Sequence, residues 1–308
     1  MIHSPFLYYI MKRIPILIIC LTLVASLCSC KQQEQGNKEP QSYTFTDDYG
    51  REVKVPSSPT RIVSVSHSVT EIMFALGAGD LLVGRTDFCT YPPEVEKIPS
   101  IGGITNMNIE QILSLQPELV LSSSMVQQKN VQQLEKMGVP FVSIIEKQQF
   151  DGLFGNIDKI GQLIDRKEAA DSLNRLLHKQ LDKVLDSLGE IVNPKTAYYV
   201  VGFGAGGNYT AGGNTFINDI ITMAGGKNIA SDVDGWSYSL ETLMQKDPEF
   251  IIIRTEDSAT FCKTQPYNRL SAVKKGNIIT IESGKLDIQG PRNIEAIKIL
   301  AARFSTKK

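Results

Sequence analysis

Two stretches of the sequence, IEQILSLQPELVL at residues 109–121 and LETLMQKDPEFII at residues 240–252, align with each other without a gap. Each stretch has a glutamate seven residues before a proline and a second glutamate directly after that proline. In each, apolar residues at helical spacing lead up to the proline, which ends a helix, and a short apolar run typical of a buried strand follows. The repeated helix–strand unit predicts two lobes built on the same plan.

The residues that precede each repeat support this prediction. Strands are predicted at residues 61–65 and 197–201, where β-branched and other apolar residues cluster. Ser68 and Glu71 have the spacing of a capping box, which predicts the start of a helix, and residues 215–224 form a helical segment that ends in two glycines. Strands that alternate with helices are typical of an α/β fold with a mainly parallel sheet in each lobe.

A long amphipathic segment separates the two lobes. Residues 166–191 carry apolar residues close to helical spacing with charged residues between them, so one long helix is expected there. About 24 residues at about 1.5 Å each give a rod of about 36 Å, the width of a lobe. We therefore expect an N-terminal lobe at residues 43–165, entered through a β-hairpin, a C-terminal lobe at residues 192–308, and a ligand cleft between the lobes.

The N-terminus predicts export and a lipid anchor. Two basic residues precede an uncharged apolar run at residues 14–27, which is too short to cross a bilayer and is typical of a secretory signal. The run ends in LCSC, which resembles a bacterial lipobox, so residues 1–29 are expected to be removed and Cys30 to be lipidated. Residues 30–42 form a polar tether, and the domain would face the periplasm or the cell surface. An uncleaved anchor helix is the alternative, which the short apolar run disfavours.

Composition and motifs argue against several classes of function. With 42% apolar residues and a net charge of -1, the chain is a folded protein with no bulk attraction to nucleic acid. Beyond residue 29 it has only two histidines and no GxSxG motif, so neither a zinc site of several imidazoles nor a serine hydrolase is indicated. The GxGxxG pattern at residues 202–207 leads into another loop instead of a helix, which disfavours a dinucleotide cofactor. No catalytic residue, metal or cofactor is predicted, Cys89 and Cys262 are expected to be unpaired, and an exported hydrolase or oxidoreductase is only an alternative.

Seven side chains are candidates for contacts with a ligand. Arginines that follow strands bind carboxylates or phosphates, and aromatic side chains suit a large, flat ligand. His67 follows the first core strand, where α/β sheets bind ligands, and it could also coordinate iron. Together these side chains predict a wide cleft for a large, flat or chelated anionic ligand. The candidates are His67, Arg85, Tyr91, Trp236, Tyr238, Arg254 and Arg292.

The order of these segments resembles that of the bacterial ABC-importer substrate-binding proteins for cobalamin, ferric siderophores and haem. The resemblance covers nearly the whole chain beyond the tether, and the DFCTYPP and NIEQI motifs are particularly similar to the cobalamin-binding branch. The matching segments are residues 61–84, 86–103, 106–121, 224–230, 236–253 and 290–292.

The resemblance implies two Rossmann-like lobes with mainly parallel sheets, joined by one long α-helix, with the ligand held between them. It also implies that Glu110 and Glu241 dock on arginines of an ABC permease dimer, which its ATPase drives, and a monomeric protein is expected. The ligand stays open, because haem binders offer Tyr or His to iron and siderophore binders use arginines. A signalling or accessory lipoprotein of the same fold, without transport, is the alternative within this family.

Overall fold

The computed structural model describes residues 41–123 and 126–305. Cys30, the predicted signal peptide and most of the predicted tether lie outside the described residues. Ser42–Lys308 form one compact unit. Within the described ranges, no helix is both long enough and apolar enough to cross a membrane.

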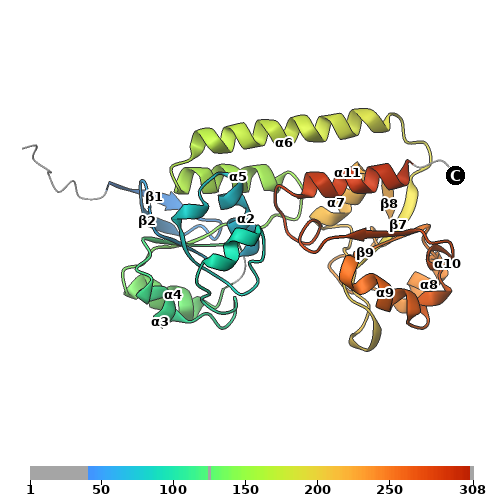
Figure 1. Cartoon of the computed structure of the whole chain (residues 1–308), viewed down its shortest axis with the longest axis horizontal. Coiled ribbons are helices and arrows are strands. Elements are labelled where there is room, and N and C mark those ends of the chain that lie inside the picture. Colours follow the sequence, from blue (N-terminus) through green and yellow to red (C-terminus); the bar gives the residue numbers. More distant parts are fainter. Residues whose placement is uncertain (1–40, 124–125, 306–308) are drawn as a thin grey trace, which may run out of the picture. The chain divides into compact units, whose positions relative to one another are not determined.

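The N-terminal lobe is built on a parallel sheet of four strands in the order β4-β3-β5-β6. A separate antiparallel hairpin precedes this sheet, as the sequence predicted for residues 43–55. Helices pack around the sheet, and Figure 1 shows this lobe in blue to green. The strands are β1 (Ser42–Thr46), β2 (Glu52–Pro56), β3 (Ile62–Ser64), β4 (Leu82–Arg85), β5 (Leu119–Ser122) and β6 (Phe141–Ser143). The helices are α2 (His67–Ala75), α3 (Ile109–Ser114), α4 (Gln128–Lys136) and α5 (Gly152–Leu163).

The C-terminal lobe contains a second parallel sheet of four strands, in the order β10-β9-β7-β8. The two sheets are separate, so the predicted α/β architecture of two parallel-sheet lobes is confirmed. The strands are β7 (Lys195–Val200), β8 (Gly226–Asn228), β9 (Phe250–Arg254) and β10 (Ile278–Ile281). The helices are α7 (Phe216–Met223), α8 (Leu240–Lys246), α9 (Thr255–Lys263), α10 (Ser271–Lys274) and α11 (Asn293–Phe304).

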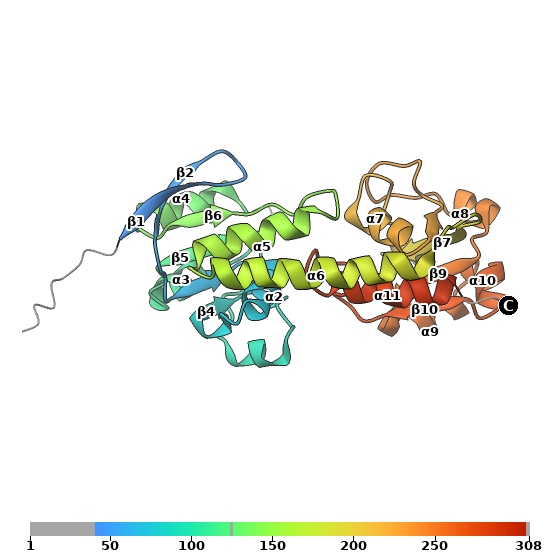
Figure 2. The ribbon, with the colours of Figure 1, turned by 90° about the horizontal axis from the view of Figure 1, so that it is seen from above.

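The long helix between the lobes is α6 (Lys167–Leu188), which has 22 residues and is slightly shorter than predicted. At about 1.5 Å per residue it spans about 33 Å. It packs against α5 of the N-terminal lobe and α11 of the C-terminal lobe, as Figures 1 and 2 show. Leu177, Leu181 and Val184 on its buried face belong to an apolar cluster that also includes residues of both lobes. The helix therefore joins the lobes through packed side chains as well as through the chain itself.

The repeated sequence has the same local structure in both lobes. Asn108 caps α3 by accepting a hydrogen bond from the Gln111 backbone amide, and Ser239 caps α8 in the same way. The glutamate after each proline accepts hydrogen bonds from the backbone at the start of the neighbouring strand. Glu118 accepts hydrogen bonds from the backbone amides of residues 60 and 61, and Glu249 accepts one from the amide of residue 196. The second glutamate of each repeat thus has a structural role.

The predicted capping box is wrong. Helix α2 begins at His67, so Ser68 already lies inside its first turn, and Ser66 is the N-cap residue without a side-chain capping bond. The Glu71 carboxylate does not accept the hydrogen bond that a capping box requires from the backbone amide at the start of the helix. It is bound instead by Arg292 of the other lobe. A contact between residues 221 positions apart outweighs the local pattern.

Candidate ligand-binding site

The two lobes touch through segments that follow the carboxyl ends of their strands. Gln289, which follows β10 in the C-terminal lobe, accepts a hydrogen bond from the Lys147 amide at 3.1 Å and donates to the carbonyls of Lys147 and Gln149 at 3.1 and 3.0 Å. Asp219 of α7 accepts a hydrogen bond from the Phe150 amide at 3.0 Å. Residues 147–150, which follow β6, are therefore clamped by the C-terminal lobe. The carboxyl ends of parallel strands are where α/β sheets bind ligands.

A buried ion pair adds a second connection between the lobes. The Arg292 guanidinium donates to both oxygens of Glu71, at 2.9 Å from Nε and 2.5 Å from Nη2. The two side chains are 10% and 3% exposed. Burial raises the pKa of the Glu71 carboxyl, while the bonds from Arg292 act in the opposite direction. This fork-to-fork pair connects α2 of one lobe to the start of α11 of the other.

An open cavity of about 480 Å³ lies beside this ion pair, and both lobes line it. The Arg292 guanidinium carbon lies 3.9 Å from the centre of the Tyr91 ring, a cation–π contact. Tyr91 is 39% exposed. The structure therefore brings together two of the predicted ligand contacts, although Arg292 is already neutralised by Glu71. The lining residues are Glu71, Phe74, Ala75, Tyr91, Pro92, Glu94, Pro291 and Arg292.

Exposed aromatic side chains follow the carboxyl ends of strands in both lobes. Phe88 and Tyr91 follow β4, and Phe88 lies edge-on to the ring of His67 with centroids 6.4 Å apart. In the C-terminal lobe, Tyr209 follows β7 and Trp236 follows β8, and backbone pairing holds their two loops together. These four aromatic side chains are between 39% and 56% exposed. Large, exposed aromatic surfaces of this kind suit a bulky, flat ligand.

Two other predicted ligand-binding residues, Arg85 and Arg254, already have partners within the protein. Arg85 donates to the carbonyls of Thr86 and Val95. Arg254 donates to the carbonyl of Val201 at 2.5 Å and lies 3.4 Å from the carboxylate of Asp257. An anion that entered the cleft would compete with these existing partners.

His67 and Tyr238 have different surroundings. His67 begins α2, and burial lowers its pKa, which favours the neutral imidazole. Tyr238 is only 6% exposed, belongs to the apolar core of the C-terminal lobe, and donates its hydroxyl to the Ile229 carbonyl. We leave Tyr238 out of the proposed site, because its ring packs in the core. In residues 41–123 and 126–305, no group of three or more His, Cys, Asp or Glu side chains is placed to hold a metal, and Cys89 and Cys262 are free thiols.

A polar cluster that the sequence prediction missed lies at the carboxyl ends of β3 and β5. Ser66 and Ser68 follow β3, Ser123 follows β5, and all three hydroxyls are hydrogen-bonded to one another. Ser123 also donates to the Glu146 carboxylate at 3.1 Å. Burial raises the pKa of Glu146, and hydrogen bonds from Ser68 and Ser123 partly offset that effect. The four residues come from three separate segments, so no local sequence pattern connects them.

A second half-buried carboxylate lies in the C-terminal lobe. Asp287 follows β10, accepts a hydrogen bond from the Tyr199 hydroxyl and lies 3.9 Å from the Arg254 guanidinium. Burial raises the pKa of Asp287 to about 6, against an opposing hydrogen bond from the Gly284 backbone. A carboxyl group whose pKa is higher in the folded state destabilises that state once it ionises.

This pKa shift predicts a pH-dependent effect of Asp287→Asn. Because the pKa of Asp287 is about 6 in the folded state and lies above the ordinary value of an aspartate, Asp287 makes the free energy of unfolding fall as the pH rises from about 4 to about 7. The variant lacks this loss, so its free energy of unfolding should rise by up to about 3 kcal/mol relative to the wild type across that range. Urea unfolding at several pH values measures the difference. A difference that does not change with pH would contradict the prediction.

The two predicted docking residues lie on matching helices. Glu110 is the second residue of α3, Glu241 is the second residue of α8, and both side chains are exposed. Figure 1 shows that α3 and α8 both lie on the side of the molecule away from α6. The repeat therefore presents one exposed carboxylate per lobe from equivalent positions.

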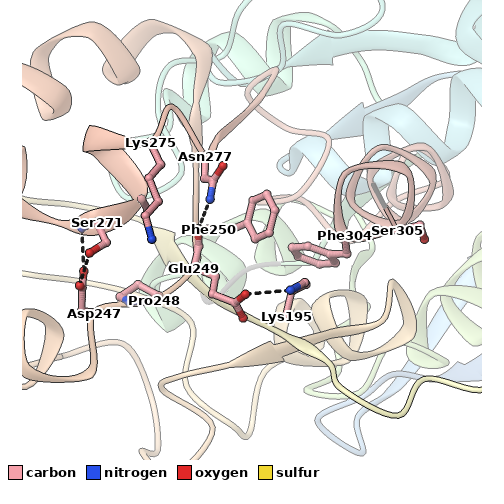
Figure 3. A pocket seen from close by; sticks show the side chains of 11 residues that line it. Lys195, Asp247, Pro248, Glu249, Phe250, Ser271, Lys275, Asn277, Phe304 and Ser305 are labelled. Carbon is pink, nitrogen blue, oxygen red and sulfur yellow. Dashed lines mark hydrogen bonds and ion pairs between the residues drawn. The ribbon is translucent and has the colours of Figure 1, made fainter. Parts of the chain in front are cut away.

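A larger cavity of about 640 Å³ lies elsewhere, at the amino ends of β7, β9 and β10 (Figure 3). Its charged groups are largely engaged: Lys195 pairs with Glu249 at 2.9 Å, and Asp247 accepts hydrogen bonds from Ser271. The amino ends of parallel strands are not the edge that binds ligands in open α/β sheets. We therefore place the candidate site at the opposite edge.

Two parallel-sheet lobes joined by one long helix define the class of two-lobed α/β proteins to which this chain belongs. The chain belongs to the periplasmic binding protein family, whose model matches residues 62–284. This is a family of substrate-binding proteins.

Individual relatives agree with this assignment. An uncharacterized ABC transporter substrate-binding lipoprotein, YvrC of Bacillus subtilis, is 29% identical over 264 residues, which is 84% of each chain. A cobalamin-binding protein of Halobacterium salinarum is 26% identical over 276 residues, covering 85% of this chain and 73% of its own. The apo structure of the periplasmic haem-binding protein RhuT of Roseiflexus superimposes with a TM-score of 0.71 at 26% identity, covering 79% of this chain and 97% of its own.

Proposed function

We propose that this protein is the lipid-anchored substrate-binding component of an ABC importer, and that it captures cobalamin or an iron chelate such as haem or a ferric siderophore. One observation carries the proposal: exposed aromatic side chains follow the strands of both lobes, Phe88 and Tyr91 on one and Tyr209 and Trp236 on the other. Two pairs of aromatic surfaces can hold a large ring system from both sides. The names of the cobalamin-binding and haem-binding relatives support this class of ligand.

The permease partner follows from the two repeated glutamates. An exposed carboxylate in the first turn of a helix stabilises that helix by only about 0.3 to 1 kcal/mol. Its recurrence at the same position of both repeats suits docking on two equivalent subunits of a permease. Glu110 and Glu241 would each meet an arginine of the permease dimer, while its ATPase supplies the energy. The protein acts as a monomer in this scheme.

The anchor rests on the sequence. Cys30 directly follows the predicted signal peptide at residues 1–29 and begins the polar tether expected at residues 30–42. The word lipoprotein in the name of the Bacillus subtilis relative supports lipidation. Lipidation at Cys30 would keep the protein at the membrane, next to its permease.

Deleting the gene in its native host tests the proposal. Uptake of labelled cobalamin, haem or a ferric siderophore should fall for one of these ligands, and re-expression of the full chain should restore it. Unchanged uptake of all three, together with normal growth on each, would contradict a role in import. It would favour an accessory protein of the same fold.

A further inference from the structure

Glu146 is a half-buried carboxylate, and it has no ion-pair partner among the described residues. The negative charge of Glu71 also acts on Glu146, and Glu71 is already bound by Arg292. The partners of Glu146 are hydroxyl groups, with Ser123 donating at 3.1 Å. The carboxylate of Glu146 is therefore stabilised by hydrogen bonds from uncharged hydroxyl groups.

The position of Glu146 makes this charge relevant to a ligand. The residue directly precedes segment 147–150, which the C-terminal lobe clamps through Gln289 and Asp219. Its hydrogen bond to Ser123 places the carboxylate at the carboxyl end of β5, one of the two central strands of its sheet. A ligand between the lobes meets this edge of the sheet.

Two of the three predicted ligand-binding arginines already have carboxylate partners, whereas Arg85 donates to neutral carbonyls and keeps its positive charge. Arg292 is bound by Glu71, Arg254 has Asp257 and the Val201 carbonyl as partners, and Arg85 donates to two backbone carbonyls. A ligand carboxylate near Glu146 would be repelled, whereas an amide N–H could donate a hydrogen bond to it.

We propose that Glu146, held by Ser68 and Ser123, is a specificity-determining residue that selects a ligand presenting amide N–H donors to the N-terminal lobe and disfavours one presenting carboxylates there. This inference rests on the proposed function and adds a preference among the proposed ligands. Within the proposed ligands it favours an amide-bearing corrinoid over a carboxylate-bearing haem.

A matched pair of corrinoids tests the inference. Cyanocobalamin carries peripheral amides, and its monocarboxylic acids each have one amide hydrolysed to a carboxylate. The full-length wild type should bind cyanocobalamin at least about tenfold more tightly than one of these acids, because the half-buried Glu146 carboxylate repels a like charge. Glu146→Gln, which keeps the shape and removes the charge, should reduce that ratio to about threefold or less by strengthening binding of the acid.

Controls separate this inference from the proposed function. Glu52→Gln makes the same charge change on an exposed strand residue and should keep the wild-type ratio. Glu146→Met, a second uncharged side chain of similar length, should narrow the ratio as Glu146→Gln does. A ratio that neither Glu146 variant changes would overturn the inference and leave the function standing. If the wild type binds haem but no corrinoid, the inference about Glu146 is wrong and the proposed function still stands. If the wild type binds none of the proposed ligands, both the inference and the proposed function are wrong.

Discussion

Reversing the charge of both Glu110 and Glu241 to arginine is expected to reduce ligand uptake by at least about tenfold, because each new arginine would repel the permease arginine on which we propose that the carboxylate docks. Either single reversal should have a smaller effect, since one lobe would still dock. Ligand affinity should stay unchanged, because both side chains are exposed on α3 and α8. Uptake in cells and stimulation of the permease ATPase by the purified protein measure docking, and a separate titration measures affinity.

Glu168 provides a matched control for this experiment. It is the second residue of α6 and is exposed, so it shares the helix position and the charge of the two docking residues. Glu168→Arg should leave uptake unchanged. Normal uptake by the double reversal would show that the repeated glutamates serve their helices alone, and a loss of uptake by Glu168→Arg would point to a general effect of charge.

Arg292→Met is expected to lower the free energy of unfolding by about 3 to 5 kcal/mol, because it leaves the buried Glu71 carboxylate without its counter-charge. The large effect follows from the burial of both side chains, which are 10% and 3% exposed. The double variant Glu71→Leu with Arg292→Met should recover most of this loss, since two apolar side chains can replace a buried ion pair at little cost. Urea unfolding of the wild type, both single variants and the double variant gives the coupling free energy.

The exposed pair formed by Lys195 and Glu249 is the natural comparison. Its side chains are 42% and 46% exposed, so breaking it with Lys195→Met should cost about 1 kcal/mol or less. If Arg292→Met costs no more than this control, the ion pair between the lobes is not a structural connection. If the double variant is no more stable than Arg292→Met, the loss arises from packing instead of unpaired charge.

The sequence predicted the features that repeat or that extend over many residues. The two aligned blocks became α3 with β5 and α8 with β9, and the amphipathic segment became α6. These predictions succeed because spacing within one segment determines which face of an element is buried. The strands β6 and β8 were not predicted, and β8 has the sequence Gly-Lys-Asn, which contains no apolar side chain to indicate a buried strand.

The candidate site was harder to predict, because its contacts are long-range. Tyr238 lies in the loop that precedes α8, where the sequence predicted a ligand contact, yet its hydroxyl donates to the Ile229 carbonyl and its ring packs in the core. Glu71 fits a capping pattern, but its partner Arg292 is 221 residues away. Glu146 meets Ser123 only because β5 and β6 are neighbours in the sheet. Exposure of Phe88 and Tyr209 also depends on the folded surface and has no local signature.

Calorimetric titration of the full-length protein with cyanocobalamin, haemin and a ferric siderophore tests the central claim most directly. The account predicts saturable binding of at least one of these ligands, with one ligand per chain and weaker binding by Trp236→Ala, which removes an exposed aromatic surface from the C-terminal lobe. The absence of saturable binding for all three ligands would contradict it.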